Sequence, residues 1–173
     1  MKIITAPDIP KLSEVSHNEI FLAGGISNCP DWQTDVLDML KDVKEEFTIY
    51  NPRREQFDLS DPTYSEEQIE WEHDKLSLVN NVIFWFPCET VCPITLYELG
   101  VAATKWKKLF VGCHPDYVRK FDVIKQLSLC RPEIVVRDSL EEIVSDVKVF
   151  LDNPFKIENN SWRTSWSAGN EVW

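Results

Sequence analysis

The sequence predicts an α/β protein with a flavodoxin-like or Rossmann-like doubly wound sheet of five parallel strands and helices on both faces. Two observations support this prediction. Apolar, strand-like runs alternate with helical patterns of about ten to fifteen residues, which is the arrangement of βαβ units. Such units imply a parallel sheet that is covered on both faces, and because crossovers between parallel strands are right-handed, the topology is restricted to a doubly wound sandwich.

The first predicted elements lie near the N-terminus. Glu19 to Ala23 predicts a buried strand that ends at a pair of glycines. Pro30-Asp31 is typical of a helix start, and apolar residues on one face continue this helix to about Lys44. Phe47 to Tyr50 predicts the second strand, which Asn51-Pro52 ends.

The middle of the chain predicts two helices around a third strand. Ser65 to Gln68 has the pattern of a capping box, so we expect a helix from Ser65 to about Asn80. Val82 to Phe86 is the third strand. After a short loop with prolines, a helix is expected from Thr95 to about Thr104.

The remaining elements repeat the alternation. Lys108 to Cys113 predicts the fourth strand, and a helix from about Tyr117 to Leu127 follows it. Ile134 to Val136 is a short fifth strand. The last helix begins at Ser139 and reaches about Leu151.

We expect a single domain over residues 1–152, because a chain of 173 residues is long enough to bury one core. Residues 153–173 fit none of these elements but keep three tryptophans, Trp162, Trp166 and Trp173. Such a tail docks on its own domain or on a neighbouring subunit, or it is disordered.

Composition narrows the class of partner. A net charge of −11 argues against DNA or RNA polymers, whose phosphates need a basic surface, but it permits a single nucleoside or nucleotide. No apolar run is long enough for a membrane span, and the N-terminus lacks a signal-peptide core. Five scattered cysteines indicate buried free thiols and a cytoplasmic protein.

One carboxylate stands where a strand ends and a helix begins, the place where ligands bind in open α/β sheets. We expect Glu98 in the first turn of the helix that follows the third strand. Thr95 to Glu98 matches a capping box, which would make the glutamate a structural cap. Alternatively, its apolar neighbours desolvate the carboxylate while the helix dipole, at about 0.3–1 kcal/mol, keeps it ionised, as a nucleophile requires.

A second carboxylate lies on an apolar helix face. Helical spacing places Glu72 on one stripe with Ile69, Leu76 and Val79, whereas Asp74 lies on the opposite, solvated side. A carboxylate on a buried stripe needs a partner. A salt bridge to an arginine and a role in a site are equally good explanations for Glu72.

Two further segments follow strands. The glycine pair of Gly24 to Ser27 lets a ligand approach the backbone closely, or it is only a turn, and it matches neither GxGxxG nor a P-loop. Arg53 and Arg54, after Asn51, bind a phosphate or carboxylate, or they pair with one of the two glutamates. Cys88 and Cys92 have no second close pair of cysteines and no suitably spaced histidine, so we expect no zinc site. We expect no other cofactor either.

Five segments, in order and within about residues 19 to 125, together resemble one known family. They are Phe21–Ile26, Asp31–Gln33, Asn51–Arg54, Glu67–Glu72 and Pro93–Gly100. This combination is similar to the nucleoside 2-deoxyribosyltransferases, in particular to the branch of deoxyribosyltransferase-like proteins. The resemblance implies a flavodoxin-like sheet, a nucleoside or nucleotide as the small-molecule partner, and assembly as a homo-oligomer.

The resemblance also implies roles for individual residues. Glu98 would attack C1′ of a 2-deoxynucleoside and form a covalent deoxyribosyl intermediate, while Glu72 would assist the leaving base. The expected substrate-binding residues are Ala23, Gly24, Gly25, Ile26, Ser27, Asn51, Arg53, Arg54, Pro93 and Thr95.

Two departures from the family pattern leave the base preference and the transfer step open. Better-known members carry Asp-x-Gly-Thr where this chain has Cys92-Pro93-Ile94-Thr95, and an aspartate where it has Asn80-Asn81. The sequence is therefore interpreted first as a deoxyribosyltransferase. The alternatives are a hydrolase of deoxynucleoside 5′-monophosphates, with Arg53, Arg54 and Ser27 at the phosphate, and a nucleotide-binding protein without turnover.

Overall fold

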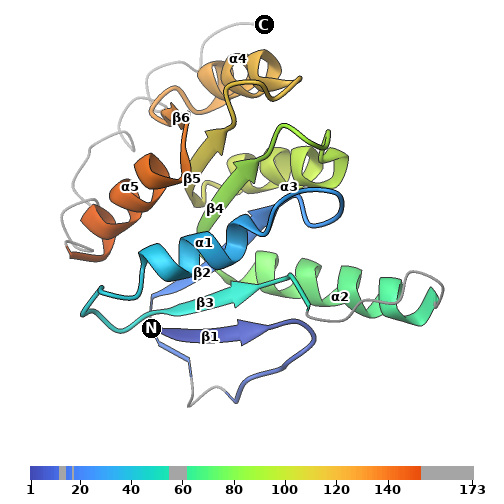
Figure 1. Ribbon diagram of the computed structural model, residues 1–173, viewed down its shortest axis with the longest axis vertical. Coiled ribbons are helices and arrows are strands. Elements are labelled where there is room, and N and C mark those ends of the chain that lie inside the picture. The colour runs from blue at the N-terminus through green and yellow to red at the C-terminus, as the bar shows by residue number, and fades with distance from the viewer. Residues whose placement is uncertain (12–14, 17, 55–61, 153–173) are drawn as a thin grey trace, which may run out of the picture.

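A computed structural model describes residues 1–11, 15–16, 18–54 and 62–152 of the chain. Its centre is a parallel sheet of six strands in the order β1-β3-β2-β4-β5-β6 (Figure 1). The strands are β1 (Lys2–Thr5), β2 (Glu19–Gly24), β3 (Thr48–Asn51), β4 (Asn81–Phe86), β5 (Lys108–Cys113) and β6 (Val136–Arg137). The predicted α/β fold with a parallel sheet is thus confirmed.

The prediction of five strands is wrong by one strand. β1 lies at the edge of the sheet and pairs in parallel with β3, where Lys2 lies opposite Thr48. The other five strands have the order second, first, third, fourth, fifth along the sheet, which is the flavodoxin-like order. β1 was missed because this edge strand has only two apolar residues, Ile3 and Ile4, and Ile3 is 44% exposed.

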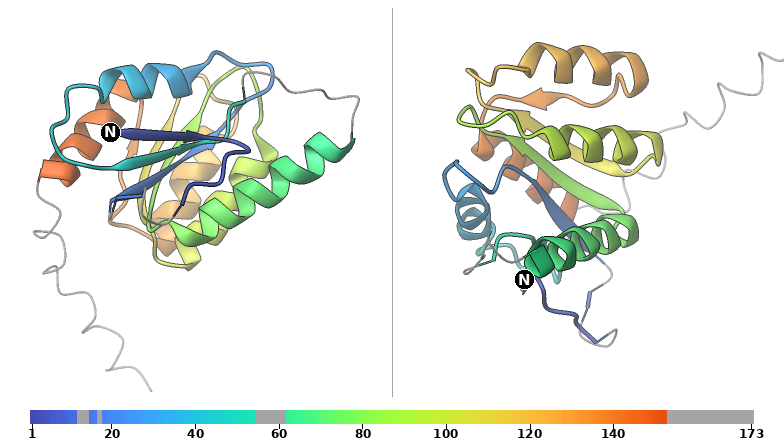
Figure 2. Two further views of the ribbon diagram at one scale, coloured as in Figure 1. Left: turned by 90° about the horizontal axis from the view of Figure 1, so that it is seen from below. Right: turned by 90° about the vertical axis from the view of Figure 1, so that its right-hand side faces the viewer.

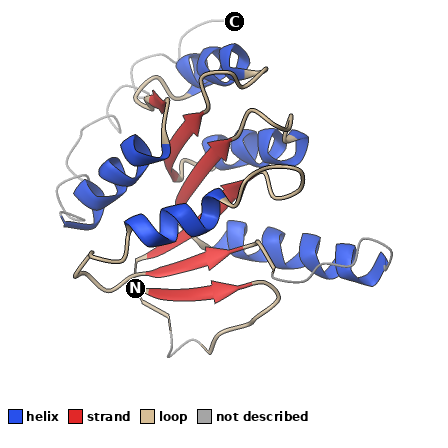
Figure 3. Ribbon diagram, viewed as in Figure 1, coloured by secondary structure: helices blue, strands red, loops and turns tan. Residues whose placement is uncertain are grey.

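Five helices lie in the described part of the chain, as predicted, but several of their ends differ from the prediction (Figure 3). α2 begins at Pro62 and α3 at Pro93, so neither predicted capping box starts its helix. α1 ends at Met39, well before Lys44. The helices are α1 (Trp32–Met39), α2 (Pro62–Leu78), α3 (Pro93–Thr104), α4 (Lys120–Cys130) and α5 (Leu140–Asp152).

The helices form two layers, with α1 and α5 on one face of the sheet and α2, α3 and α4 on the other (Figure 2). Alternation along each strand fills both cores, since successive side chains point to opposite faces. In β2, Ile20 and Leu22 pack toward α1 and α5, whereas Phe21 and Ala23 pack toward the other layer. Because both faces are covered, the strands read as continuous apolar runs.

The strand order reverses between β2 and β4. After β2 the chain forms β3, which lies on one side of β2. The next strand, β4, lies on the other side of β2, and β5 and β6 follow outward from it. β2 and β4 pair from Ile20 opposite Asn81 to Gly24 opposite Trp85, so their carboxyl ends and the loops that follow them lie together. This reversal is the topological switch point where open α/β sheets form a crevice for ligands.

No helix in residues 1–11, 15–16, 18–54 and 62–152 has the length and apolar character needed to cross a bilayer. The tryptophan-containing tail, residues 153–173, lies outside the described residues, so its predicted docking stays a prediction.

The close pairing of β2 with β4 predicts that Gly24→Ala destabilises the protein. A Cβ atom at Gly24 would lie 2.5 Å from both the Trp85 carbonyl oxygen and Cζ2 of Trp32, so the ladder must spread. We expect a loss of about 1–3 kcal/mol in the free energy of unfolding, measured by urea denaturation.

Gly100→Ala is the matched control, because a Cβ atom at this exposed helix position meets nothing within 4 Å. We expect this substitution to stabilise the protein by about 0.5–1 kcal/mol. Equal effects of the two alanines would contradict the packing described for the switch point.

Candidate functional site

A cavity of about 540 Å³ opens at the switch point, between the loop after β2 and the helices α2 and α3. It brings together most of the residues predicted for the site. Those that line it are Ala23, Gly24, Gly25, Ile26, Ser27, Glu72, Pro93, Thr95 and Glu98. Asn51, Arg53 and Arg54 do not line it but border a second, more open hollow next to β1 and α1.

Glu98 reaches the cavity from the second turn of α3, not from the first turn as predicted. The helix starts at Pro93, and its N-cap, Cys92, has a left-handed backbone with φ of 48° and makes no side-chain cap bond. The predicted capping role of Glu98 is therefore wrong. The predicted stabilisation by the helix dipole also fails, because that effect is confined to the first turn.

Glu72 lies on α2 and lines the same cavity, half-buried. Its carboxylate oxygen Oε1 accepts a hydrogen bond of 2.6 Å from Nε2 of Gln68, one turn earlier in the helix. The predicted stripe is wrong at Ile69, which is 65% exposed at the cavity rim, while Leu76 and Val79 are buried as expected. Asp74 is exposed, as predicted.

The two carboxyl groups influence each other's ionisation. Burial, followed by the negative charge of Glu72, raises the pKa of Glu98 to about 8. Burial also raises the pKa of Glu72, although the hydrogen bond from Gln68 and the charge of Arg54 counteract it. At neutral pH the pair therefore holds one proton and one negative charge, and the prediction that Glu98 stays ionised is wrong.

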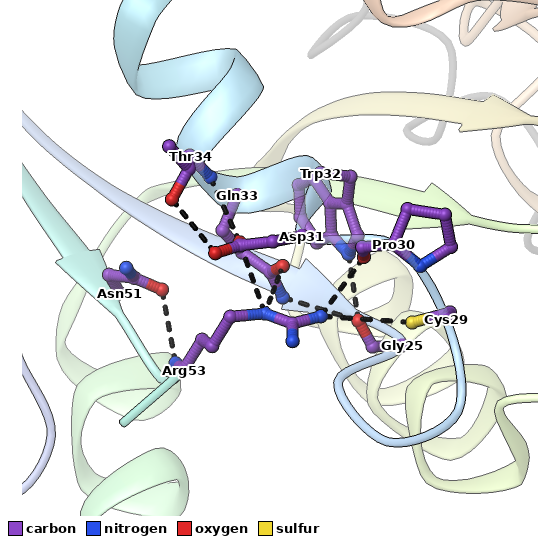
Figure 4. A network of polar contacts seen from close by, with 9 residues as sticks. All are labelled: Gly25, Cys29, Pro30, Asp31, Trp32, Gln33, Thr34, Asn51 and Arg53. Carbon is purple, nitrogen blue, oxygen red and sulfur yellow. Dashed lines mark hydrogen bonds and ion pairs between the residues drawn. The ribbon is translucent and has the colours of Figure 1, made fainter. Parts of the chain in front are cut away.

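The loop after β2 is held in place by residues of α1 and by Arg53 (Figure 4). The Gly25 carbonyl oxygen accepts hydrogen bonds from Nε1 of Trp32 at 2.8 Å and from Nε2 of Gln33 at 3.2 Å. Nε of Arg53 donates to Oε1 of Gln33 at 2.8 Å and lies 3.1 Å from Oδ1 of Asp31. The Arg53 guanidinium thus holds the loop in place and does not face the cavity.

Arg54 is likewise engaged within the protein. Its Nε donates to Oε1 of Gln68 at 2.5 Å, and its Nη1 lies 2.7 Å from Oε2 of Glu67. The predicted pairing of an arginine with Glu72 is therefore indirect, because Gln68 stands between the two groups.

Several cavity residues had no role in the sequence prediction. Ile69, Ile94 and Tyr97 form an apolar rim and are 65%, 66% and 72% exposed. Lys105 and Lys107 also line the cavity, and the ammonium group of Lys107 donates to the carbonyl oxygens of Ser77 and Val79 at the end of α2. Ile94 and Tyr97 flank predicted site residues in sequence, whereas no local pattern marks the lysines.

The thiols do not offer a second nucleophile. Cys92 lines the cavity, but burial raises its pKa to about 11, so it is neutral near pH 7. All five cysteines are free; Cys92 and Cys113 are buried as expected, whereas Cys130 is exposed. Within the described ranges, no cluster of three or more His, Cys, Asp or Glu side chains could hold a metal ion.

The half-buried, desolvated carboxyl of Glu98 predicts a pH-dependent gain in stability for Glu98→Gln. Between about pH 4.5 and pH 8 the folded wild type retains a proton that the unfolded chain loses, so its stability falls as the pH rises. The glutamine variant lacks this loss. We expect its free energy of unfolding to exceed that of the wild type by about 1–4 kcal/mol at pH 8.

Urea denaturation at pH 5 and pH 8 measures this difference, which should shrink toward the acidic end. A difference that does not depend on pH would show that Glu98 is not held in a desolvated site.

The sequence was also compared with known protein families and with curated proteins. Residues 17–117 match the family model described as nucleoside 2-deoxyribosyltransferase like. This match covers both β2 with its glycine loop and the two helices that carry Glu72 and Glu98. No curated protein matches the chain significantly. Because the family model covers more than half of its length, the chain belongs to the nucleoside 2-deoxyribosyltransferase-like family.

Proposed function

We propose that this protein cleaves the N-glycosidic bond of 2-deoxynucleosides and transfers the sugar to another base through a covalent intermediate on Glu98. The observation that carries the proposal is the pair of carboxyl groups that share one cavity at the switch point. Glu98 comes from α3 and Glu72 from α2, and together they hold one proton. Retaining glycosidases need the same two groups, one charged and one protonated.

The reaction then proceeds in two balanced displacements. In the first, a carboxylate oxygen of Glu98 bonds to C1′, and the bond from C1′ to the base nitrogen breaks. Its electron pair leaves with the base, which takes the proton from Glu72. In the second, a nitrogen of the incoming base attacks C1′, the ester bond to Glu98 breaks, and Glu72 recovers a proton from that base.

The cavity walls suit a nucleoside. The apolar rim of Ile69, Ile94 and Tyr97 offers one aromatic ring and two aliphatic side chains to a base. Binding of a base there would displace water from these exposed side chains and bury their apolar surface, which favours binding. The Gly24 to Ser27 loop offers backbone groups and one hydroxyl to the sugar. We therefore assign the loop to the sugar and the rim to the base.

The geometry favours nucleosides over 5′-monophosphates. The hydrolase alternative relied on Arg53 and Arg54 as phosphate ligands, but both guanidinium groups are engaged in internal contacts and neither lines the cavity. Ser27 is the remaining member of that set at the cavity. We further propose that a second copy of the chain covers the exposed apolar rim, so that the protein works as a homo-oligomer.

Incubation with a 2-deoxynucleoside and a foreign base tests the proposed function. Formation of the new nucleoside supports transfer, whereas release of free base from a 5′-monophosphate supports the hydrolase. Binding without either product would assign the chain to the non-catalytic alternative. Chromatography of the bases and nucleosides distinguishes these three results.

We expect Glu98→Ala to abolish release of the base, because the proposed reaction forms its covalent bond to C1′ on the Glu98 carboxylate. Glu70→Gln is the control, since Glu70 is an exposed carboxylate on α2 that does not line the cavity. Turnover by the alanine variant at a rate near that of the wild type would end the assignment of Glu98 as the nucleophile.

The shared proton predicts a bell-shaped pH profile of kcat/KM for the wild type, with its alkaline limb near pH 8, where the pair loses that proton. Glu72→Gln removes the acid and the negative neighbour of Glu98. We expect the rate to fall by about 10²–10⁴-fold and the alkaline limb to disappear. The control variant Glu70→Gln should keep the alkaline limb of the profile. An alkaline limb that is also present in Glu72→Gln would exclude Glu72 as the proton donor.

A further inference from the structure

Gln68 is the polar residue next to the carboxyl pair that the proposed reaction leaves without a role. We propose that Gln68, held by Arg54, is a positioning residue that makes Oε1 of Glu72 a fixed hydrogen-bond acceptor and leaves Oε2 to exchange the catalytic proton. The role in catalysis rests on the proposed function, whereas the hydrogen-bond relay itself does not. The relay runs in one direction, from Arg54 through Gln68 to Glu72.

The orientation of the Gln68 amide is set by its neighbours. Nε of Arg54 can only donate, so the amide atom 2.5 Å from it is the oxygen. The Pro52 carbonyl can only accept, so the amide atom 2.7 Å from it is the nitrogen. Both contacts therefore require the same orientation of the amide. If the amide were flipped, its NH₂ group would face the N–H of Arg54 and its oxygen would face the Pro52 carbonyl oxygen.

With the amide so oriented, one N–H remains for Glu72. It points at Oε1 of Glu72 over 2.6 Å, so Oε1 is the acceptor of this hydrogen bond. Because that N–H donates, Oε1 cannot itself carry a proton toward Gln68. Any proton on Glu72 is therefore carried by Oε2.

The relay is anchored more firmly than a surface contact. The side chain of Arg54 is only 5% exposed, and it also contacts Glu67. Gln68 is buried as well. Nη2 of Arg54 is buried without a hydrogen-bond partner among the described residues.

The relay decides which member of the pair holds the proton before substrate binds. The charged groups that act on Glu72 are Arg54, from the segment after β3, and Glu98, from α3; His73, Lys105 and Lys107 line the same cavity. Gln68 and Arg54 favour the ionised form of Glu72, whereas Glu98 has no such support. The free protein thus keeps the proton on Glu98. In the reactive state that proton lies on Oε2 of Glu72, and Glu98 carries the charge.

Carbon-13 NMR of protein with labelled glutamate carboxyl groups tests the relay without any substrate. Glu72→Gln and Glu98→Gln assign the two signals. We expect Glu72 to titrate at lower pH than Glu98 in the wild type, and its titration to move to higher pH in Gln68→Met. Gln68→Glu keeps the contact with Arg54 but cannot donate, and it should move the titration of Glu72 further in the same direction.

Gln33→Met is the matched control. Gln33 is also buried, accepts from Nε of Arg53 at 2.8 Å, and donates to the Gly25 carbonyl instead of a carboxylate. It should leave both glutamate titrations in place. A Glu72 titration that stays unmoved in both folded Gln68 variants overturns the proposed relay, as does an equal shift in Gln33→Met.

Kinetics separate this inference from the proposed function. If the protein transfers deoxyribose, Gln68→Met should lower kcat by up to about 10²-fold and move the acidic limb of kcat/KM to higher pH. The alkaline limb should stay near pH 8. A shifted titration in a protein that turns over no nucleoside would refute the function and retain the relay, whereas normal turnover with an unmoved acidic limb would refute the positioning role.

Discussion

The two carboxyl groups of Glu72 and Glu98 share one desolvated cavity, and they can keep only one negative charge between them near neutral pH. A pair with one proton offers a nucleophile and an acid together, which a single carboxylate cannot do. The same burial opposes folding, so the protein maintains this pair at the expense of its own stability.

The fold supplies the constraint through its topology. At the reversal of strand order between β2 and β4, two helices of the same layer, α2 and α3, flank the crevice and each contributes one glutamate. The floor is held by close backbone packing at Gly24 and by the bonds from Trp32 and Gln33 to the Gly25 carbonyl. Two adjacent arginines serve different parts of this frame: Arg53 fastens the glycine loop, and Arg54 orients the amide that contacts Glu72.

Sequence reasoning predicted the parallel sheet apart from β1 and all five described helices, because these depend on the periodicity of apolar residues. The resemblance to a known family, not the periodicity, joined Glu72 with Glu98 in one site, and both line the cavity at the switch point. It failed where the outcome depended on three-dimensional context. The start of α3 at Pro93 turned an expected cap into a buried carboxyl, since Thr95 matched a capping box two residues inside the helix. The arginines were assigned to ligand because no local pattern shows that Gln33 and Gln68 engage them. β1 was missed because it lies at the edge of the sheet and only two of its residues are apolar.

The central claim is that Glu98 becomes the charged partner when substrate arrives and bonds to C1′. Mass spectrometry of the intact protein, quenched in acid after brief mixing with a 2-deoxynucleoside, tests it most directly. We predict added mass equal to one deoxyribosyl group, located on the peptide that contains Glu98 and absent from Glu98→Gln. Accumulation of free base or a new nucleoside with no such adduct at any mixing time, or an adduct on another residue, would contradict the account.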